Sequence, residues 1–182
     1  MRAPPALSSM RLFALLAGIV AAGCAVRQEP TEISLERTGC FGFCPRYKIA
    51  LRADGSVTYA GPGYQDSETG HRLNPSLPER ADTVVPDAVI RTAFAAFESG
   101  WSRWLPNRFQ IDRRTCLMAA TDHPTVYVVR NWKDRSDTTE VYYGCSAIPQ
   151  RLTRLAATID SLSGVDRWLG PFPHRDPPAD ER

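Results

Sequence analysis

The segment Cys40-Phe41-Gly42-Phe43-Cys44-Pro45-Arg46-Tyr47 gathers two cysteines, a glycine, a proline and three aromatic residues within eight positions. Apolar residues alternate with polar ones in two runs that follow it, and a tight-turn dipeptide, Asp54-Gly55, separates the runs. The alternating apolar residues are Tyr47, Ile49, Leu51, Val57 and Tyr59. This pattern predicts a β-hairpin. The segment is therefore expected to be a loop that leads into a hairpin.

Further strands are expected on both sides of this hairpin. Ile33 and Leu35 alternate with polar residues just before the cysteine segment, which predicts a half-buried strand there. Residues 125–129 and 138–143 are rich in β-branched and aromatic residues, and a polar turn over 131–137 separates them. The cysteine segment is thus expected to connect two strands, and a second hairpin is expected later in the chain.

Two helices are expected, each with one apolar face. The first opens at Pro86-Asp87, and its apolar residues follow spacings of four, three, four and three: Ile90, Phe94, Phe97, Trp101 and Trp104. The second begins at Pro149 and stops at Gly164, with the same spacings at Ile148, Leu152, Leu155, Ile159 and Leu162. Such stripes are typical of helices that pack on a sheet. Trp168 is expected to fold back onto the core.

This order of elements predicts an α+β fold. Strands joined as hairpins, rather than through parallel crossovers, favour an antiparallel sheet with two helices on one face, a two-layer sandwich. Residues 60–84 are rich in glycine, proline and polar residues, so they are expected to form a surface excursion with one short strand near 71–73. Residues 109–118 carry several charges and are expected to be exposed.

The amino terminus has the features of an export signal. Arg2 and Arg11 precede an uncharged apolar run over 12–20, which is too short to span a membrane. The small residues before Cys24 resemble the lipobox of bacterial lipoproteins, so Cys24 is expected to become the lipidated first residue. Ordinary cleavage near Gly23 is the alternative. Met10 makes a more compact start for the signal than Met1.

These boundaries divide the chain into four parts: a signal peptide over 1–23, a tether over 24–32, a single domain over 33–168 and a disordered tail over 169–182. Removing the signal leaves equal numbers of basic and acidic residues, so no basic surface predicts nucleic-acid binding. Ala25 is not the aspartate associated with inner-membrane retention of lipoproteins. We therefore expect an anchor in the outer membrane, with the domain facing the periplasm.

Four cysteines follow Cys24, at positions 40, 44, 116 and 145. An even number in an exported chain predicts disulfides, and three pairings are open. Proximity favours Cys40 with Cys44 and Cys116 with Cys145. On the chain-entropy model the shorter loop contributes about 2 kcal/mol and the longer loop about 3.6 kcal/mol, so the second pair is the stronger structural crosslink.

The spacing Cys40-x-x-x-Cys44-Pro45 has an alternative interpretation as a redox or metal site. The same spacing occurs in thioredoxin-fold proteins that deliver copper, where it opens a helix that activates the thiolate. Here Pro45 leads into a predicted strand. We therefore expect a structural disulfide whose Gly42 permits the bend. A thiol redox or copper- or zinc-binding role is the alternative.

No other segment predicts a reaction, a cofactor or a metal. The histidines of the expected domain, His71 and His123, lie in loops without metal-ligand spacing, and no two acids pair as an acid and base. Arg108, Arg113 and Arg114 could form an anion patch, although such a run is more often a solvated loop. Catalytic residues and metal ligands are therefore not assigned.

The residues from Ile33 to Tyr47, followed by Asp54-Gly55, Val57 and Tyr59, resemble the DUF6438 family of bacterial envelope proteins of unknown function. Residues near the carboxyl end resemble that family's closing helix and tryptophan: Leu152, Leu155, Ile159, Asp160 and Trp168. The resemblance extends over about 33–168, and its specific motif includes Gly42, Pro45 and Tyr47. Cys116 and Cys145 look like an addition to the family pattern, which supports pairing them with each other. The family implies no catalytic residue.

Overall fold

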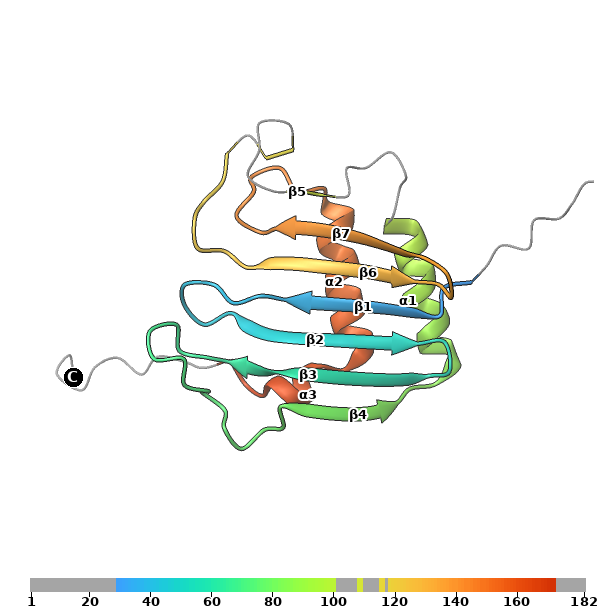
Figure 1. Ribbon diagram of the computed structural model, residues 1–182, viewed down its shortest axis with the longest axis horizontal. Coiled ribbons are helices and arrows are strands. Elements are labelled where there is room, and N and C mark those ends of the chain that lie inside the picture. Colours follow the sequence, from blue (N-terminus) through green and yellow to red (C-terminus); the bar gives the residue numbers. More distant parts are fainter. Residues whose placement is uncertain (1–28, 101–107, 110–114, 117, 173–182) are drawn as a thin grey trace, which may run out of the picture.

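The computed structural model of this chain describes residues 29–100, 108–109, 115–116 and 118–172. An open sheet forms one layer, and the helices lie together on one face of it (Figure 1). The strands are β1 (Glu32–Arg37), β2 (Pro45–Arg52), β3 (Ser56–Tyr64), β4 (Arg80–Val84), β5 (Arg108–Phe109), β6 (Thr125–Asn131) and β7 (Ser136–Tyr142). The helices are α1 (Asp87–Gly100), α2 (Gln150–Ser163) and α3 (Asp166–Leu169). The predicted α+β fold class is confirmed.

The strand order across the sheet is β4-β3-β2-β1-β6-β7-β5. β1 lies in the interior, with Leu35 opposite Ile49 of β2 on one side and opposite Val128 of β6 on the other. Six strands pair antiparallel, as expected, and the two-residue strand β5 adds a parallel pair with β7. Segments far apart in the sequence, the cysteine motif and the second hairpin, are therefore neighbours through β1.

The core lies between the sheet and the helices. Because side chains alternate between the two faces of a strand, every second residue of the central strands points toward the helices. The buried sheet residues on this face include Ile33, Leu35, Tyr47, Ile49, Leu51, Val57, Tyr59, Val126 and Val128. Ile90 and Phe97 of α1 and Leu155 and Ile159 of α2 pack against them. The residues of each predicted stripe that the structure describes are therefore buried or partly buried.

The region after β3 differs in detail from the prediction. The strand expected near 71–73 is only an isolated bridge between Gln65 and Arg72, and a regular strand, β4, lies further along at Arg80–Val84. β4 is an edge strand whose exposed side chains alternate with half-buried ones, so it has no apolar run to reveal it. The strand predicted for 71–73 was therefore wrong. The strand at Arg80–Val84 was missed because an edge strand needs few apolar residues.

The carboxyl end of α2 agrees with the prediction. Gly164 adopts a left-handed conformation with φ 65° and caps the helix, as glycine does without strain. The chain then turns into α3, which buries Trp168 over Tyr59 with 5.2 Å between the ring centroids. Trp168 thus covers the core, as its position predicts. Trp101 and Trp104 lie outside the described residues.

Candidate functional site

The cysteine motif forms a short loop at one end of the sheet, between β1 and β2 (left in Figure 1). A disulfide joins Cys40 to Cys44, whose Cα atoms are 5.5 Å apart. The backbone N–H of Phe41 donates to the carbonyl of Asp122 at 3.1 Å, and the N–H of Thr125 donates to the Thr38 hydroxyl at 2.8 Å. The loop is therefore held from within by the disulfide and from outside by the first residue of β6 and the segment before it.

The side chain of Phe41 points out of this fixed loop. Phe41 is 72% exposed, although Tyr47, six residues later, is buried in the core. Gly42 has φ 136°, a conformation that a residue with a side chain rarely adopts, so a glycine is required at this bend. The predicted role of Gly42 therefore has a geometric basis.

The second disulfide joins Cys116 to Cys145. Both cysteines are buried, whereas Cys40 and Cys44 are half-exposed. A β-bridge between Ala119 and Cys145 runs beside this disulfide, so it fastens the segment before β6 to the segment after β7. Both disulfides are those that proximity favours. They crosslink two connections at the same end of the sheet.

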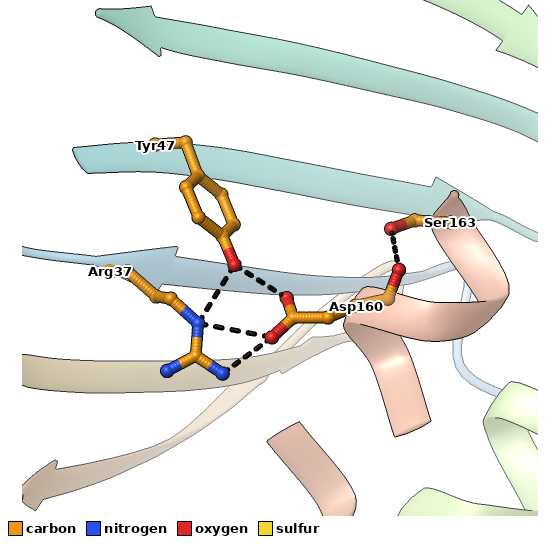
Figure 2. Close-up of polar contacts among 4 residues, drawn as sticks. All are labelled: Arg37, Tyr47, Asp160 and Ser163. Atoms are coloured by element: carbon orange, nitrogen blue, oxygen red, sulfur yellow. Dashed lines mark hydrogen bonds and ion pairs between the residues drawn. The ribbon is translucent and has the colours of Figure 1, made fainter. Parts of the chain in front are cut away.

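A largely buried polar cluster lies behind the loop, on the helix-covered face of the sheet (Figure 2). It joins Arg37 at the end of β1, Tyr47 in β2 and Asp160 in α2. The Nε atom of Arg37 donates to the Tyr47 hydroxyl at 2.8 Å and to Oδ2 of Asp160 at 3.0 Å, and Nη2 donates to the same oxygen at 2.5 Å. The Tyr47 hydroxyl donates in turn to Oδ1 of Asp160 at 2.9 Å.

The environment of this cluster shifts the pKa of each group upward. Burial raises the pKa of Tyr47 well above its usual range, and Asp160 reinforces this effect while Arg37 opposes it. Burial also raises the pKa of Asp160 against the opposing effect of Arg37. Burial lowers the pKa of Arg37, but Tyr47 and Asp160 outweigh it and the net direction is upward. Tyr47 is therefore a neutral hydrogen-bond donor at neutral pH.

The hydrogen bonds of this cluster connect three elements of the fold. The Tyr47 hydroxyl both accepts and donates a hydrogen bond, and the two carboxylate oxygens of Asp160 both accept. The Ser163 hydroxyl adds a bond to the Asp160 carbonyl, which tightens the last turn of α2. The cluster therefore ties the two strands that flank the motif to the helix above them.

The sequence predicted only one member of this cluster as a motif residue, Tyr47. Arg37 and Asp160 were not predicted as a pair because 123 positions separate them. A signal for Arg37 was nevertheless present. Arg37 follows Ile33 and Leu35 at every second position of the same strand, so its side chain points to the same face as theirs. That face is the core face, so Arg37 was expected to lie in the core or at its edge.

A second arginine cluster lies at the opposite end of the same sheet face. Arg130 of β6 contacts Glu98 of α1 and Asp137 of β7, and its guanidinium lies 4.7 Å from the ring centroid of Phe97 and 4.2 Å from that of Trp132. A hollow of about 380 Å³ lies beside it, lined in part by Arg91, Arg130 and Arg135. This cluster also joins helix to sheet.

The loop borders a polar groove. A hollow of about 340 Å³ is lined by residues 38–40, Gly42, Cys44 and Arg46 on one side and by Gln65, Asp66, Ser67 and Gly70 of the β3–β4 connection on the other. A second hollow, of about 260 Å³, adjoins it on the bare face of the sheet, since Thr38 and Arg46 line both. The groove therefore combines residues from two separate parts of the chain.

The other predicted site residues lie apart. Cys24, Arg113 and Arg114 are outside the described residues, and Arg108 belongs to β5. His71 and His123 are exposed and lie in different loops. Within the described part of the chain, no group of three or more metal-ligating side chains is close enough to hold an ion, and no helix is long and apolar enough to cross a bilayer.

Together these features define a two-layer α+β domain with a disulfide-closed loop at one end and a polar groove beside it. The family model described as a domain of unknown function, DUF6438, matches residues 31–163, and the chain belongs to this family. A search of curated proteins finds no match. The match begins just before β1 and ends with α2, so it contains the whole motif and the Arg37–Tyr47–Asp160 cluster.

Proposed function

We propose that this protein is a lipid-anchored envelope protein whose α+β domain is a non-catalytic binding or structural module stabilised by disulfides. The observation that carries this proposal is that all four cysteines of the domain are paired within it. Protein disulfides persist in oxidising compartments, such as the periplasm, and are rare in a reducing cytosol. The lipobox-like segment that ends at Cys24 supports an anchor, and Ala25 favours the outer membrane.

The direction of the chain supports this proposal. The described chain enters the sheet at the start of β1, on the right in Figure 1, whereas the disulfide loop lies at the left end. A domain anchored through Cys24 would therefore present the loop and its groove away from the membrane surface. An exposed aromatic residue beside a polar groove suits contact with a partner or ligand.

The alternative is a thiol redox or metal-binding role for Cys40 and Cys44, and their partial exposure is the observation that favours it. The low thiol pKa of such cysteines usually depends on a helix amino terminus or a nearby cation. Arg46 lines the same hollow as Cys40 and Cys44 and supplies a cation, but Pro45 begins a strand, so the helix amino terminus is missing. The brace role is therefore the better supported one.

Metabolic labelling with a radioactive fatty acid tests the anchor. Cells that produce the full-length protein should incorporate label, and Cys24→Ala should abolish it. The double variant Cys40→Ala/Cys44→Ala is the matched control, because it removes two cysteines of the same chain and should retain the label. Undiminished labelling of Cys24→Ala would contradict the anchor.

Thiol trapping of protein taken directly from cells tests the disulfides. We expect Cys40, Cys44, Cys116 and Cys145 to be unreactive toward an alkylating reagent until a reductant is added. A largely reduced Cys40–Cys44 pair, or copper or zinc that purifies with the protein and is lost in Cys40→Ala/Cys44→Ala, would support the redox or metal role instead.

A further inference from the structure

The groove beside the disulfide loop is built around one arginine. Arg46 is exposed on β2, and it lines both hollows of the groove, so its side chain lies where they meet. One Nη atom of Arg46 donates to the side-chain carbonyl of Gln65 at 3.1 Å. Gln65 in turn donates to the carbonyl of Gly70 at 3.0 Å. These bonds fix the arginine and the opposite wall of the groove relative to each other.

Gly39 provides the space for this arginine. A Cβ atom on Gly39 would lie 2.9 Å from Cδ and 3.2 Å from Cγ of Arg46, closer than such carbon atoms normally approach. The Arg46 side chain therefore crosses directly over the backbone of the loop. Because Gly39 and Gly42 have no side chains, they present backbone to the groove.

The guanidinium of Arg46 and the carboxylate of Asp66 differ in the partners that they already have. Among the described residues, Arg46 makes no ion pair, and its hydrogen-bond partner Gln65 is neutral. The acid in the wall of the first hollow, Asp66, uses one carboxylate oxygen to accept bonds from Glu68 and Thr69 in its own turn. The guanidinium of Arg46 can therefore receive an anion, while Asp66 holds the loop.

We propose that this groove binds a carboxylate group, with Arg46 as the residue that recognises it. The planar guanidinium fork matches a carboxylate in two parallel hydrogen bonds. A monoanion fits better than a phosphate dianion, because Asp66 and Glu36 line the two hollows and would repel a second negative charge. The inference deepens the proposed binding role and rests on it.

The adjoining hollow extends this site along the bare face of the sheet. Lys48 and Glu36 line it, and they lie opposite each other on β2 and β1. A ligand whose carboxylate contacts Arg46 would continue past this pair of opposite charges, which suits a polar chain such as a short peptide. The ligand class is thus a polar chain that ends in a carboxylate.

A titration of the full-length protein, labelled with ¹⁵N and kept oxidised, tests this site. The probe is N-acetylglycylglycine, with its carboxyl-terminal amide and inorganic phosphate as separate arms. Up to roughly 10 mM probe, a range that covers weak binding by a small fragment, we expect saturable shifts of the Gly39 and Gly42 amide signals with the acid. Equal binding of the amide, tighter binding of phosphate, or no saturable shift would each overturn the proposal.

Two variants test whether Arg46 is the residue that binds the carboxylate of the probe. Arg46→Gln should weaken binding of the acid by about tenfold or more, since a hydrogen bond to a charged group is lost. Arg52→Gln changes an arginine of the same strand and face whose partner is Glu32 at the far end, and it should leave the affinity unchanged. Equal effects of the two variants would overturn the assignment.

Gly39→Ala keeps the charge but displaces the Arg46 side chain, so it should weaken binding several-fold without loss of the folded spectrum. Unchanged affinity in this variant would contradict the proposed path of the arginine. If the protein carries lipid and both disulfides but does not bind N-acetylglycylglycine, only the proposed carboxylate site is contradicted. The anchored-domain proposal would then stand on its own tests.

Discussion

Two arginines project from the same face of one sheet, and the protein satisfies them in different ways. Arg37 contacts a largely buried carboxylate and a tyrosine hydroxyl, and the side chains of Arg37 and Asp160 are 15% and 18% exposed. Arg130 is more deeply buried, at 9%, but its carboxylate partners Glu98 and Asp137 are 37% and 41% exposed. Two aromatic rings cover Arg130 instead.

The difference shows that burial of an arginine does not by itself decide how much its acidic partner contributes to stability. The exposure of the acid also matters. A carboxylate that stays in contact with water can be removed at small cost, because water screens the pair. A carboxylate that is buried with its partner leaves an uncompensated charge behind. The end of the sheet beside the cysteine motif therefore depends on a single buried acid, and the other end does not.

Asp160→Ala should produce the largest effect. Removing the carboxylate leaves Arg37 buried without its counter-ion, and we expect a loss of about 3–5 kcal/mol in the free energy of unfolding. Urea denaturation followed by circular dichroism measures it. The triple variant Arg37→Met/Tyr47→Phe/Asp160→Leu should recover most of this loss, because it leaves neither a buried charge nor an unpaired tyrosine hydroxyl. A triple variant as unstable as Asp160→Ala would contradict this account.

High pH should destabilise the cluster around Arg37 through Tyr47. A tyrosine in the unfolded chain ionises near pH 10, whereas burial holds the proton of Tyr47 in the folded protein. The stabilisation is therefore complete below about pH 10 and falls above it by at most about 1.4 kcal/mol per pH unit for this one group. Denaturation at several pH values above 10 measures the slope. A stability that stays flat there would contradict the buried, protonated state.

Tyr47→Phe should distinguish the contribution of the Tyr47 hydroxyl to stability from that of the Arg37–Asp160 ion pair. At neutral pH the variant loses the hydrogen bonds of one hydroxyl, and we expect a cost of about 1–2 kcal/mol. Above pH 10 it should lose less stability than the parent protein. Tyr59 and Tyr64, whose pKa values burial also raises, remain in both proteins and provide the common background. Parallel pH curves would exclude Tyr47 as the source.

Asp137→Asn should give the smallest effect. Because Asp137 is partly exposed and Arg130 keeps Glu98 and its aromatic neighbours, we expect a change below about 1 kcal/mol. Added salt should reduce even this difference, since screening acts on exposed pairs first. A loss as large as that of Asp160→Ala would show that exposure of the partner is not what distinguishes the two clusters.

Much of the fold follows from local patterns. The alternation around Asp54-Gly55 predicted the β2–β3 hairpin, and the four-three spacing predicted α1 and α2 with their buried faces. These signals succeed because the residues involved bury apolar surface within one element. The edge strand β4 escaped prediction because its outward side chains are charged or exposed and only one neighbour pairs with it.

The candidate site followed from the sequence less completely. The Cys40–Cys44 loop, Gly42 and Tyr47 stand close together in the chain, so their motif was visible. The ion pair of Arg37 with Asp160 and the contact of Arg46 with Gln65 depend on how distant segments meet. One side of such a contact can be guessed from strand alternation, but its partner is set by the packing of the whole domain.

The interior position of β1 has a mechanical consequence. β1 is bonded along both edges, to β2 and to β6, and the chain enters it directly at Glu32. A force applied to the amino terminus along the strand would load both ladders in shear, with their bonds sharing the tension, instead of opening them one after another. In a domain held by its amino terminus, a pulling force would thus act first on a strand that is hydrogen-bonded along both edges.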